Sequence, residues 1–362
     1  MSVLFTPIRI GTLEVPNRLA RSATGEGMCA PDGGVTPPLV ELYRRLARGG
    51  AGLLMTGHSF VRPDGKASDG MMGVHSDEMI PGLRRIVQAV GETDARIACQ
   101  LNHAGRQTRP ERIGGVTPVG PSAVRCPVNR VTPRALEEAE IEPLIESFVA
   151  AAVRCREAGF DGVQLHCAHG YLMSEFISPH TNRRDDAWGG SLEARARFPL
   201  EVLRRIRCAL GADYPVLVKL NAEDFIEGGL TLEESTRIGA MMEAEGIDAI
   251  EVSAGMARTA SKIMRRGIET ESDEAYFLPH CRELRRHVGV PLLCVGGLRS
   301  KGVMERIVES GDADIASLCR PLIREPDLPR KFRQGACDRA ACVSCNRCTR
   351  GPDQQLGCAL EA

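Results

Sequence analysis

Two histidines and a tyrosine follow one another where an apolar run ends. The segment VQLHCAHGYL (163–172) places His166, His169 and Tyr171 at a predicted strand end, next to a glycine. Three explanations fit this grouping: imidazoles that donate hydrogen bonds to a substrate oxygen, a metal-binding pair, or rings that simply pack together. A zinc ion would need a third ligand, and no Asp, Glu or Cys stands at an obvious strand end to supply it. We therefore favour the first explanation.

The chemistry that this trio would perform is the activation of a conjugated carbonyl compound. Two neutral imidazoles that donate to one carbonyl oxygen would stabilise the negative charge that develops there when an electron-rich group attacks the conjugated carbon. Tyr171 lies two residues beyond His169, so its hydroxyl group could then deliver a proton. His166, His169 and Tyr171 are the candidate catalytic residues.

A phosphate site is indicated further along the chain. The segments VGGLRS and SLCRPLI contain Gly296, Gly297 and Arg320 at two successive strand ends. Glycines let backbone N–H groups approach a phosphate, and an arginine can bind it with two parallel hydrogen bonds. The alternative is a Gly-Gly turn beside a surface arginine.

Two further strand ends carry polar groups. Lys219 ends the run PVLVKLN, and an apolar approach of this kind is also what a Schiff-base aldolase uses for its lysine. Gln100 and His103 in CQLNHAGR supply uncharged hydrogen-bonding groups, and a side-chain amide suits the mixed donors and acceptors of a heterocycle. A purely structural role for Gln100 is the alternative.

The elements that must position these residues alternate along the chain. Eight short runs rich in β-forming residues read as buried parallel strands: 18–24, 51–57, 96–102, 160–166, 215–221, 248–254, 291–297 and 313–319. Amphipathic segments lie between them, and several end in glycine as helices do. Eight such units predict a (β/α)8 TIM barrel of the α/β class, whose reacting residues lie where strands end. An open doubly wound sheet is the alternative, but no strand is followed by GxGxxG.

Three segments interrupt this alternation. Residues 104–135 and 179–190 are long connections on the expected catalytic face, where they could form a lid or rim. Residues 337–362 follow the eighth unit. We therefore divide the chain into a barrel domain, 1–336, and a short Cys-rich tail, 337–362.

Composition restricts the class of function. The chain of 362 residues is 43% hydrophobic and carries a net charge of −1, which argues against general binding of nucleic acid or a membrane surface. No signal-like or membrane-spanning segment is apparent, so a cytoplasmic protein that acts on a small molecule is expected. Most of the fourteen cysteines, such as Cys99, Cys155, Cys208 and Cys294, lie in apolar runs and should act as small hydrophobes.

The cysteines of the tail need another explanation. Cys342, Cys345 and Cys348 form C-x2-C-x2-C, and Cys358 follows after nine residues. Three closely spaced thiolates and one distant thiolate are typical of a 4Fe-4S cluster. Four thiolates can also hold zinc, and a tail with unused cysteines is the third alternative.

Several of these motifs resemble a known family. NRLARSAT, QLNHAGRQ, HCAHGYLMSEFISPHTNRRDDAWGGS and SLCRPLIREPDL, at these relative positions, resemble the Old Yellow Enzyme family of FMN-dependent NAD(P)H oxidoreductases over about residues 3–330. The tail further resembles the branch that contains 2,4-dienoyl-CoA reductase and trimethylamine dehydrogenase, in which a 4Fe-4S cluster follows the barrel. The resemblance implies non-covalent FMN in the mouth of the barrel.

It also implies roles for individual residues. His166 and His169 would bind the activating oxygen of the substrate and Tyr171 would be the proton donor. The residues implied to bind FMN are Ala23 and Thr24 against the ring, Gln100 at its pyrimidine edge, Lys219 near N1 and O2, and Gly297, Cys319 and Arg320, with Gly296, at its phosphate. NADH or NADPH would reduce FMN and leave, and an activated alkene would then accept hydride at its β-carbon. Some bacterial members carry a flavin-side cysteine where this chain has Gly25.

Two alternatives to this ene-reductase remain open. Within the family, an oxidative dehydrogenase or demethylase would pass electrons from FMN through the cluster to an electron-transfer protein partner. From another class, a Schiff-base aldolase would use Lys219. We also expect a homo-oligomer.

Overall fold

Eight parallel strands form a closed ring in the computed structural model, which describes residues 2–350 and 355–360. Pairing of β13 with β3 and of β4 with β6 closes the ring, and the short strand β5 (Ser59–Phe60) adds to the edge of β6. The ring contains, in order, β3 (Leu19–Arg21), β4 (Leu53–Met55), β6 (Arg96–Asn102), β9 (Gly162–Cys167), β10 (Val216–Asn221), β11 (Ala249–Ser253), β12 (Leu292–Val295) and β13 (Ile315–Leu318). The predicted TIM barrel is confirmed.

The strands lie where the sequence predicts them, but several are shorter. The run 51–57 contains only the three residues of β4, and the run 291–297 ends at Val295. Gly296 and Gly297 have φ angles of 123° and 74°, so they leave the extended conformation and turn the chain. The hydrophobic pattern therefore finds the strands, and the glycines set where they stop.

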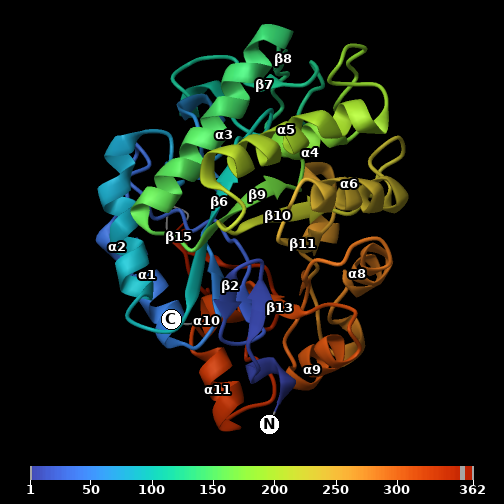
Figure 1. The fold of residues 1–362 in the computed structure, drawn as a ribbon. Helices are drawn as coiled ribbons and strands as arrows, with labels where there is room; N and C mark the ends of the chain where they lie inside the picture. Colours follow the sequence, from blue (N-terminus) through green and yellow to red (C-terminus); the bar gives the residue numbers. More distant parts are fainter. Residues whose placement is uncertain (1, 351–354, 361–362) are drawn as a thin grey trace.

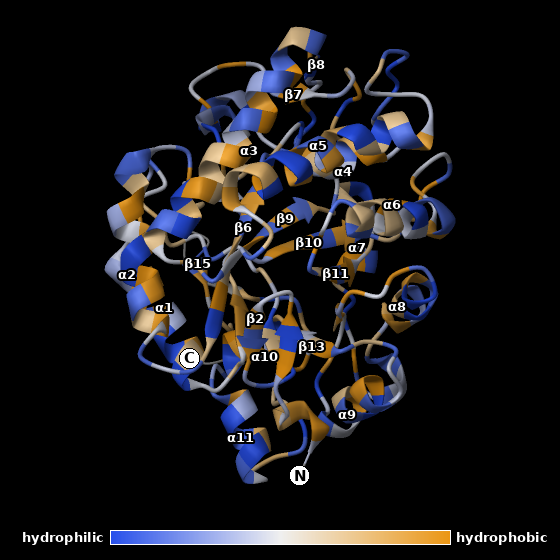
Figure 2. Cartoon of the chain, in the orientation of Figure 1, coloured by the Kyte–Doolittle hydropathy of each residue, from blue (hydrophilic) through white to orange (hydrophobic). Residues whose placement is uncertain are grey.

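Helices surround the ring, as Figure 1 shows. The longer ones are α1 (Pro37–Arg48), α2 (Ile80–Val90), α3 (Glu138–Ala158), α5 (Leu192–Leu210), α6 (Leu232–Ala244), α8 (Leu278–Arg285), α9 (Lys301–Glu309) and α11 (Leu328–Gln334). They mix hydrophilic and hydrophobic residues along their length, as expected for helices with one buried face (Figure 2). Thr231 and Glu234 form a reciprocal capping box at the start of α6, and Gly159 ends α3 in the left-handed conformation.

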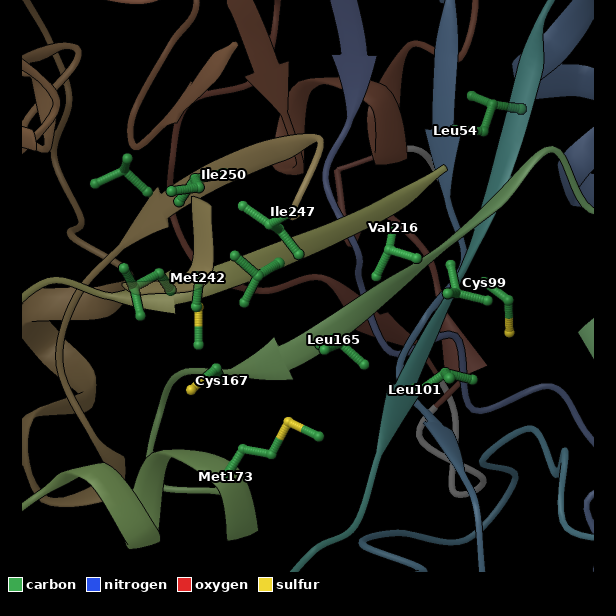
Figure 3. Close-up of a cluster of buried hydrophobic side chains, with 14 of the residues drawn as sticks. Leu54, Cys99, Leu101, Leu165, Cys167, Met173, Val216, Met242, Ile247 and Ile250 are labelled. Atoms are coloured by element: carbon green, nitrogen blue, oxygen red, sulfur yellow. The ribbon is translucent and has the colours of Figure 1, made fainter. Parts of the chain in front are cut away.

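The main core lies between the strands and the helices. Figure 3 shows Leu165, Val216 and Ile250 of neighbouring strands in one buried cluster with Met173 and Met242. At the amino-terminal end of the ring, the hairpin of β1 (Ile8–Ile10) and β2 (Leu13–Val15) packs on a second apolar cluster inside the barrel. Three of the four cysteines predicted to be core residues are buried, but Cys208 is exposed, because it lies on the outer face of α5.

The segments that interrupt the barrel have little regular structure. In the connection 104–135, β7 (Val119–Gly120) pairs with β8 (Arg134–Ala135). In the tail, β14 (Thr349–Arg350) pairs with β15 (Gln355–Leu356), and residues 351–354 and 361–362 of the predicted tail lie outside the described residues. The boundary at residue 337 stays a prediction. Within the described part of the chain, no helix is long and apolar enough to cross a membrane.

Candidate active site

A cavity of about 340 Å³ opens at the carboxyl ends of the strands. The predicted catalytic and FMN-binding residues of the barrel all line it, although they come from six strand ends. They are Ala23, Thr24, Gln100, His166, His169, Tyr171, Lys219, Gly296, Gly297, Cys319 and Arg320. The strand ends thus bring together the residues that the sequence singles out, while the role of each one stays a prediction.

The rings of His166, His169 and Tyr171 form a compact group. The ring centroids of His166 and His169 are 5.4 Å apart, and those of His166 and Tyr171 are 4.9 Å apart. His166 belongs to β9, whereas His169 and Gly170 turn the chain with φ angles of 64° and 76°. The side-chain amide of Gln107 donates to the His169 carbonyl oxygen at 2.8 Å. This turn places His169, which lies two positions past the end of β9, at the cavity.

Both imidazoles are neutral at physiological pH. Burial, with contributions from the charges of Lys219 and His58, lowers the pKa of His169 to about 3. Burial also lowers the pKa of His166 well below its usual value, and its Nδ1 atom has no hydrogen-bond partner among the described residues. An unpartnered polar atom at such a place is costly unless a ligand satisfies it. The pair therefore presents uncharged hydrogen-bonding groups to a ligand.

A third histidine joins this group, and the sequence reasoning missed it. Thr56 follows β4 directly, but its hydroxyl group accepts from the backbone of Gln100 and the residue does not line the cavity. His58, two residues on, lines the cavity with its ring centroid 5.1 Å from that of Tyr171. The Asn102 amide donates to His58 Nδ1 at 3.0 Å, which assigns the ring proton to Nε2.

The His58 ring also lies close to Gly25. A Cβ atom at Gly25 would come within 3.7 Å of His58 Nε2. Burial lowers the pKa of His58 to about 4, so this ring is also neutral. A histidine two residues past a short strand gives a weak signal, because alternation along the strand does not extend into the loop.

A buried polar chain lies beneath the cavity. Gln100 donates to Gln164 at 2.7 Å, and Gln164 donates to Glu251 at 3.0 Å. Lys219 lies 3.3 Å from Glu251 and donates to Ser22 at 2.8 Å. Burial opposes ionisation of Glu251, but the Lys219 ammonium and hydrogen bonds from Ser317 and Gln164 outweigh it, so its pKa is lowered. This hydrogen-bonded network holds both the Gln100 amide and the Lys219 side chain in place.

This network bears on the aldolase alternative. Schiff-base formation requires a lysine amine with a free lone pair. The Lys219 ammonium is buried, paired with a carboxylate and engaged by a hydroxyl group. That arrangement holds a fixed positive charge at the floor of the cavity rather than a nucleophile.

The predicted phosphate end contains an arginine with a defined orientation. Nη1 of Arg320 donates to the carbonyl oxygens of Arg265 and Ser344 and to the side chain of Asn346. Its remaining N–H groups are available for a ligand. Beside it, the Thr24 hydroxyl and the Cys319 sulfur lie 3.1 Å apart, which connects the first and eighth strand ends.

One polar residue predicted near the site lies elsewhere. His103 is buried, but it does not line the cavity. Its Nε2 atom lies 3.4 Å from Asp64, and Nδ1 accepts from the backbone N–H of Gly105 at 3.1 Å. His103 follows the end of β6, where the chain has already turned away from the cavity, so it does not supply a hydrogen-bonding group there as the sequence predicts.

The tail cysteines are not arranged as a metal site. In the described ranges, no three His, Cys, Asp or Glu residues are placed so that they could hold a metal ion. Cys342 and Cys358 are buried, and Cys345 and Cys348 are half-buried. The described residues therefore show no cluster site, and the predicted 4Fe-4S cluster stays a prediction.

FMN, in contrast, suits the cavity. The Gln100 amide uses one N–H on Gln164, which leaves its oxygen for the N–H of a heterocycle. Arg320 supplies cationic donors, and His166 and His169 line the same cavity. A volume of about 340 Å³ is in the range of small-molecule and cofactor sites. Ala23, Thr24, Gln100, Lys219, Gly296, Gly297, Cys319 and Arg320 are the residues that would hold it.

A closed parallel barrel with such a rim is typical of a TIM-barrel enzyme whose active site lies in the mouth of the barrel. The NADH:flavin oxidoreductase / NADH oxidase family model matches residues 3–339, and the chain belongs to this family. The family implies FMN and NAD(P)H, as the motifs predict.

Individual relatives extend this comparison. An NADH oxidase of Thermoanaerobacter brockii is 39% identical over 95% of this chain and 52% of its own length. A 2-naphthoyl-CoA reductase in complex with 2-naphthoyl-CoA has 33% identity and a TM-score of 0.90 over 98% of this chain and 56% of that chain. An old yellow enzyme homologue from Zymomonas mobilis has 27% identity and a TM-score of 0.82 over 99% and 97%. The chain thus spans about half the length of the first two proteins.

Proposed function

We propose that the protein reduces the C=C bond of an activated alkene, such as an enone, an enal or an enoyl thioester, at the expense of NAD(P)H. When bound, FMN would supply the hydride chemistry, because it accepts hydride from NAD(P)H and passes it to the alkene. The observation that carries the proposal is the convergence of neutral His166 and His169 with Tyr171 in a cavity that suits FMN.

The histidine pair would bind and polarise the substrate carbonyl group. Neutral imidazole N–H groups donate to an oxygen without first transferring a proton to it, so they stabilise the charge that develops there. Ser253, 2.7 Å from His169 Nε2, helps to hold that ring. The rings are fixed before substrate arrives, because Gln107 and the turn at Gly170 hold the backbone of His169.

Tyr171 would protonate the α-carbon. Burial raises the pKa of Tyr171 to about 12, so its hydroxyl group keeps its proton at neutral pH. A carbanion-like centre next to a carbonyl group is a stronger base than a phenolate, so a phenol can still serve as its proton donor. Tyr171 precedes α4 (Leu172–Ile177) as its N-terminal cap residue, and its side chain packs against the apolar cluster that contains Phe60 and Met71.

The names of the relatives support a reductive reaction. The 2-naphthoyl-CoA reductase was solved with an aromatic acyl-CoA thioester, and the relative from Thermoanaerobacter brockii is an NADH oxidase. Enoyl and aromatic thioesters are therefore the substrates to test beside simple enones.

An anaerobic experiment tests the proposal. We expect the purified protein to show the flavin spectrum, to be bleached by NADH or NADPH, and to recover its colour when cyclohexenone or crotonyl-CoA is added. A protein that retains no FMN after gentle purification, or a reduced flavin that no enone, enal or enoyl thioester reoxidises, would contradict it.

The same sample tests the predicted cluster and the dehydrogenase alternative. A 4Fe-4S cluster in the tail predicts about four iron atoms per chain and a broad absorbance that dithionite bleaches. Electron transfer from an amine substrate to an external acceptor, in preparations that contain this iron, would favour the oxidative reaction.

A further inference from the structure

A hydrogen bond joins His169 to the end of the neighbouring strand β11. The Nε2 atom of His169 lies 2.7 Å from the hydroxyl oxygen of Ser253, the last residue of that strand. This separation is that of a hydrogen bond between nitrogen and oxygen, and it is too short for a contact from a ring C–H group. Both residues line the cavity, and Ser253 is buried. The contact therefore lies within the candidate active site.

Two arrangements of protons are compatible with this distance. Either the imidazole N–H donates to the hydroxyl oxygen, or the hydroxyl group donates to an unprotonated Nε2. Since burial lowers the pKa of His169 to about 3, its ring is neutral and carries a single proton. The two arrangements therefore place that proton on different ring nitrogens. The direction of this one hydrogen bond decides which nitrogen of His169 can donate to a ligand.

The surroundings of Ser253 favour its hydroxyl group as the donor. Among the described residues, His169 is the only hydrogen-bond partner of this hydroxyl group. If the imidazole donated, the protein would offer no acceptor to the hydroxyl proton, and an unsatisfied donor at a buried position is costly. If the hydroxyl group donates to Nε2, the same bond satisfies both groups.

The second ring nitrogen of His169 is available to a ligand. Its Nδ1 atom forms no hydrogen bond with a described residue, and unlike the unpartnered Nδ1 atom of His166 it is not fully buried. Because His169 lines the cavity, Nδ1 is the nitrogen through which this ring can bind a carbonyl oxygen. With the proton on Nδ1 the ring would stabilise charge on that oxygen, whereas a lone pair there would repel it.

The backbone of His169 is held by other groups. Its carbonyl oxygen accepts from the Gln107 amide at 2.8 Å, and the residue forms a β-bridge with Met256. Its N–H group donates to the Asn221 side chain at 3.5 Å, and the Asn221 amide donates to the buried Asp224 carboxylate at 2.7 Å. These contacts hold a φ angle of 64°, which a residue other than glycine adopts only at a cost. A change of the Ser253 side chain should therefore alter the proton on the ring more than the position of the ring.

We propose that Ser253 is a positioning residue that sets the tautomer of His169. Its hydroxyl group donates to Nε2, so that the ring proton lies on Nδ1 and is available to the carbonyl group of the substrate. The identity of that ligand rests on the proposed function, but the tautomer is a property of the protein alone. Ser253 transfers no proton in this role and acts only through His169.

The tautomer can be measured directly by ¹⁵N NMR of the FMN-loaded protein labelled at histidine, because protonated and unprotonated ring nitrogens have well-separated shifts. The chain contains eight histidines, and His169→Gln and His58→Gln identify two of the spin systems by their absence. We expect His169 to carry its proton on Nδ1 at neutral pH. His58, whose Nδ1 accepts from the Asn102 amide, should carry it on Nε2 and serves as the internal reference.

Variants of Ser253 test the cause of this tautomer. In Ser253→Ala the donor to Nε2 is lost, so the His169 signals should move toward those of the Nε2–H tautomer, while the His58 signals stay unchanged. Ser253→Thr keeps a hydroxyl group and should keep the wild-type signals. Ser147→Ala is the matched control, because it removes a hydroxyl group that donates to Pro143 within α3.

Reoxidation of the flavin provides a second readout. Reduction with dithionite leaves NAD(P)H out of the measurement, and cyclohexenone is then added. Loss of the hydrogen bond that favours the productive tautomer predicts about three- to tenfold slower reoxidation in Ser253→Ala. Ser253→Thr and Ser147→Ala should react at close to the wild-type rate.

A wild-type His169 with its proton on Nε2, or with protons on both ring nitrogens, would overturn the proposal. A tautomer that is the same in Ser253→Ala as in the wild type would overturn it as well. The NMR signals do not depend on turnover, so they decide this point even if no alkene reoxidises the flavin. In that case it is the proposed function that fails, and the two failures are told apart.

Discussion

The rim of the barrel and the C-terminal tail both carry residue patterns that predict chemistry. The structure brings the rim residues together in one cavity, whereas it shows no metal site among the described residues of the tail. At the rim, His166, His169 and Tyr171 lie together in one cavity. In the tail, Cys342, Cys345 and Cys348 have a spacing typical of a cluster, yet the described residues contain no group arranged to hold a metal ion. The same kind of evidence from sequence leads to two different outcomes.

The difference lies in what surrounds each pattern. The rim residues are attached to strands whose register is fixed by pairing on both sides, so a position along the strand becomes a position in space. Among the described residues of the tail, the strands are two of two residues each, and they pair with each other rather than with the barrel sheet. The position of a motif's residues in space can therefore be predicted from sequence when paired strands carry them, and less well when a segment with little regular structure does.

The largest expected effect is the loss of alkene reduction in Tyr171→Phe. Removal of a positioned proton donor costs about 10²- to 10⁴-fold in rate, while reduction of FMN by NAD(P)H should stay within about threefold of the wild type. Stopped-flow measurement of the two half-reactions separates these effects. Tyr276→Phe is the matched control, because Tyr276 also lines the cavity but its hydroxyl group is engaged by Ile263. Equal losses in both half-reactions would remove Tyr171 as the proton donor.

A second large effect is expected beneath the cavity. Glu251→Gln would leave the buried Lys219 ammonium without its carboxylate, and loss of one partner of a buried pair costs about 3–5 kcal/mol of unfolding free energy. Glu142→Gln removes an exposed partner of Arg205 and should cost less than about 1 kcal/mol. Urea unfolding monitored by circular dichroism gives both values. Similar costs for the two variants would show that Lys219 is neutral in the folded protein.

These residues also show how far sequence reasoning reaches. The hydrophobic runs locate all eight strands, and the polar residues at strand ends locate the cavity, because the barrel places every strand end at one rim. Gln164 and Glu251 were missed, since each lies inside a strand rather than at its end, and only the structure shows that they join Gln100 to Lys219. A carboxylate within the apolar run DAIEVSA is the signal that could have found Glu251.

A pH-dependent loss of stability is expected from the buried histidines of the rim. The folded-state pKa of His58 is about 4, below the ordinary value of about 6.5, so the unfolded chain binds the extra proton first as the pH falls. The stability due to this group is complete above about pH 6.5 and decreases toward pH 4, by about 2–3 kcal/mol at pH 4.5.

Unfolding in urea at about pH 7.5 and pH 4.5 measures this effect. His58→Leu should lose less stability between the two pH values than the wild type does, by about 2–3 kcal/mol. His287→Leu, at an exposed position just past α8, should lose as much as the wild type. If His58→Leu behaves like His287→Leu, the His58 ring is not held neutral by burial.

The smallest expected effect tests whether the tail takes part in the site at the rim. Asn346 accepts a hydrogen bond from Arg320 and donates to the carbonyl oxygen of Met264 at 2.7 Å, so it is a direct contact between the tail and the predicted phosphate end. Two backbone carbonyl oxygens also hold Arg320, and they remain in Asn346→Ala. We therefore expect FMN to bind only about threefold more weakly, as fits the loss of one hydrogen bond among several. Fluorescence titration of the apoprotein with FMN measures the change, with Asn17→Ala, at the other end of the barrel, as the control. A loss of a hundredfold or more would mean that the tail is an integral part of the cofactor site, and the contrast between the rim and the tail would no longer hold.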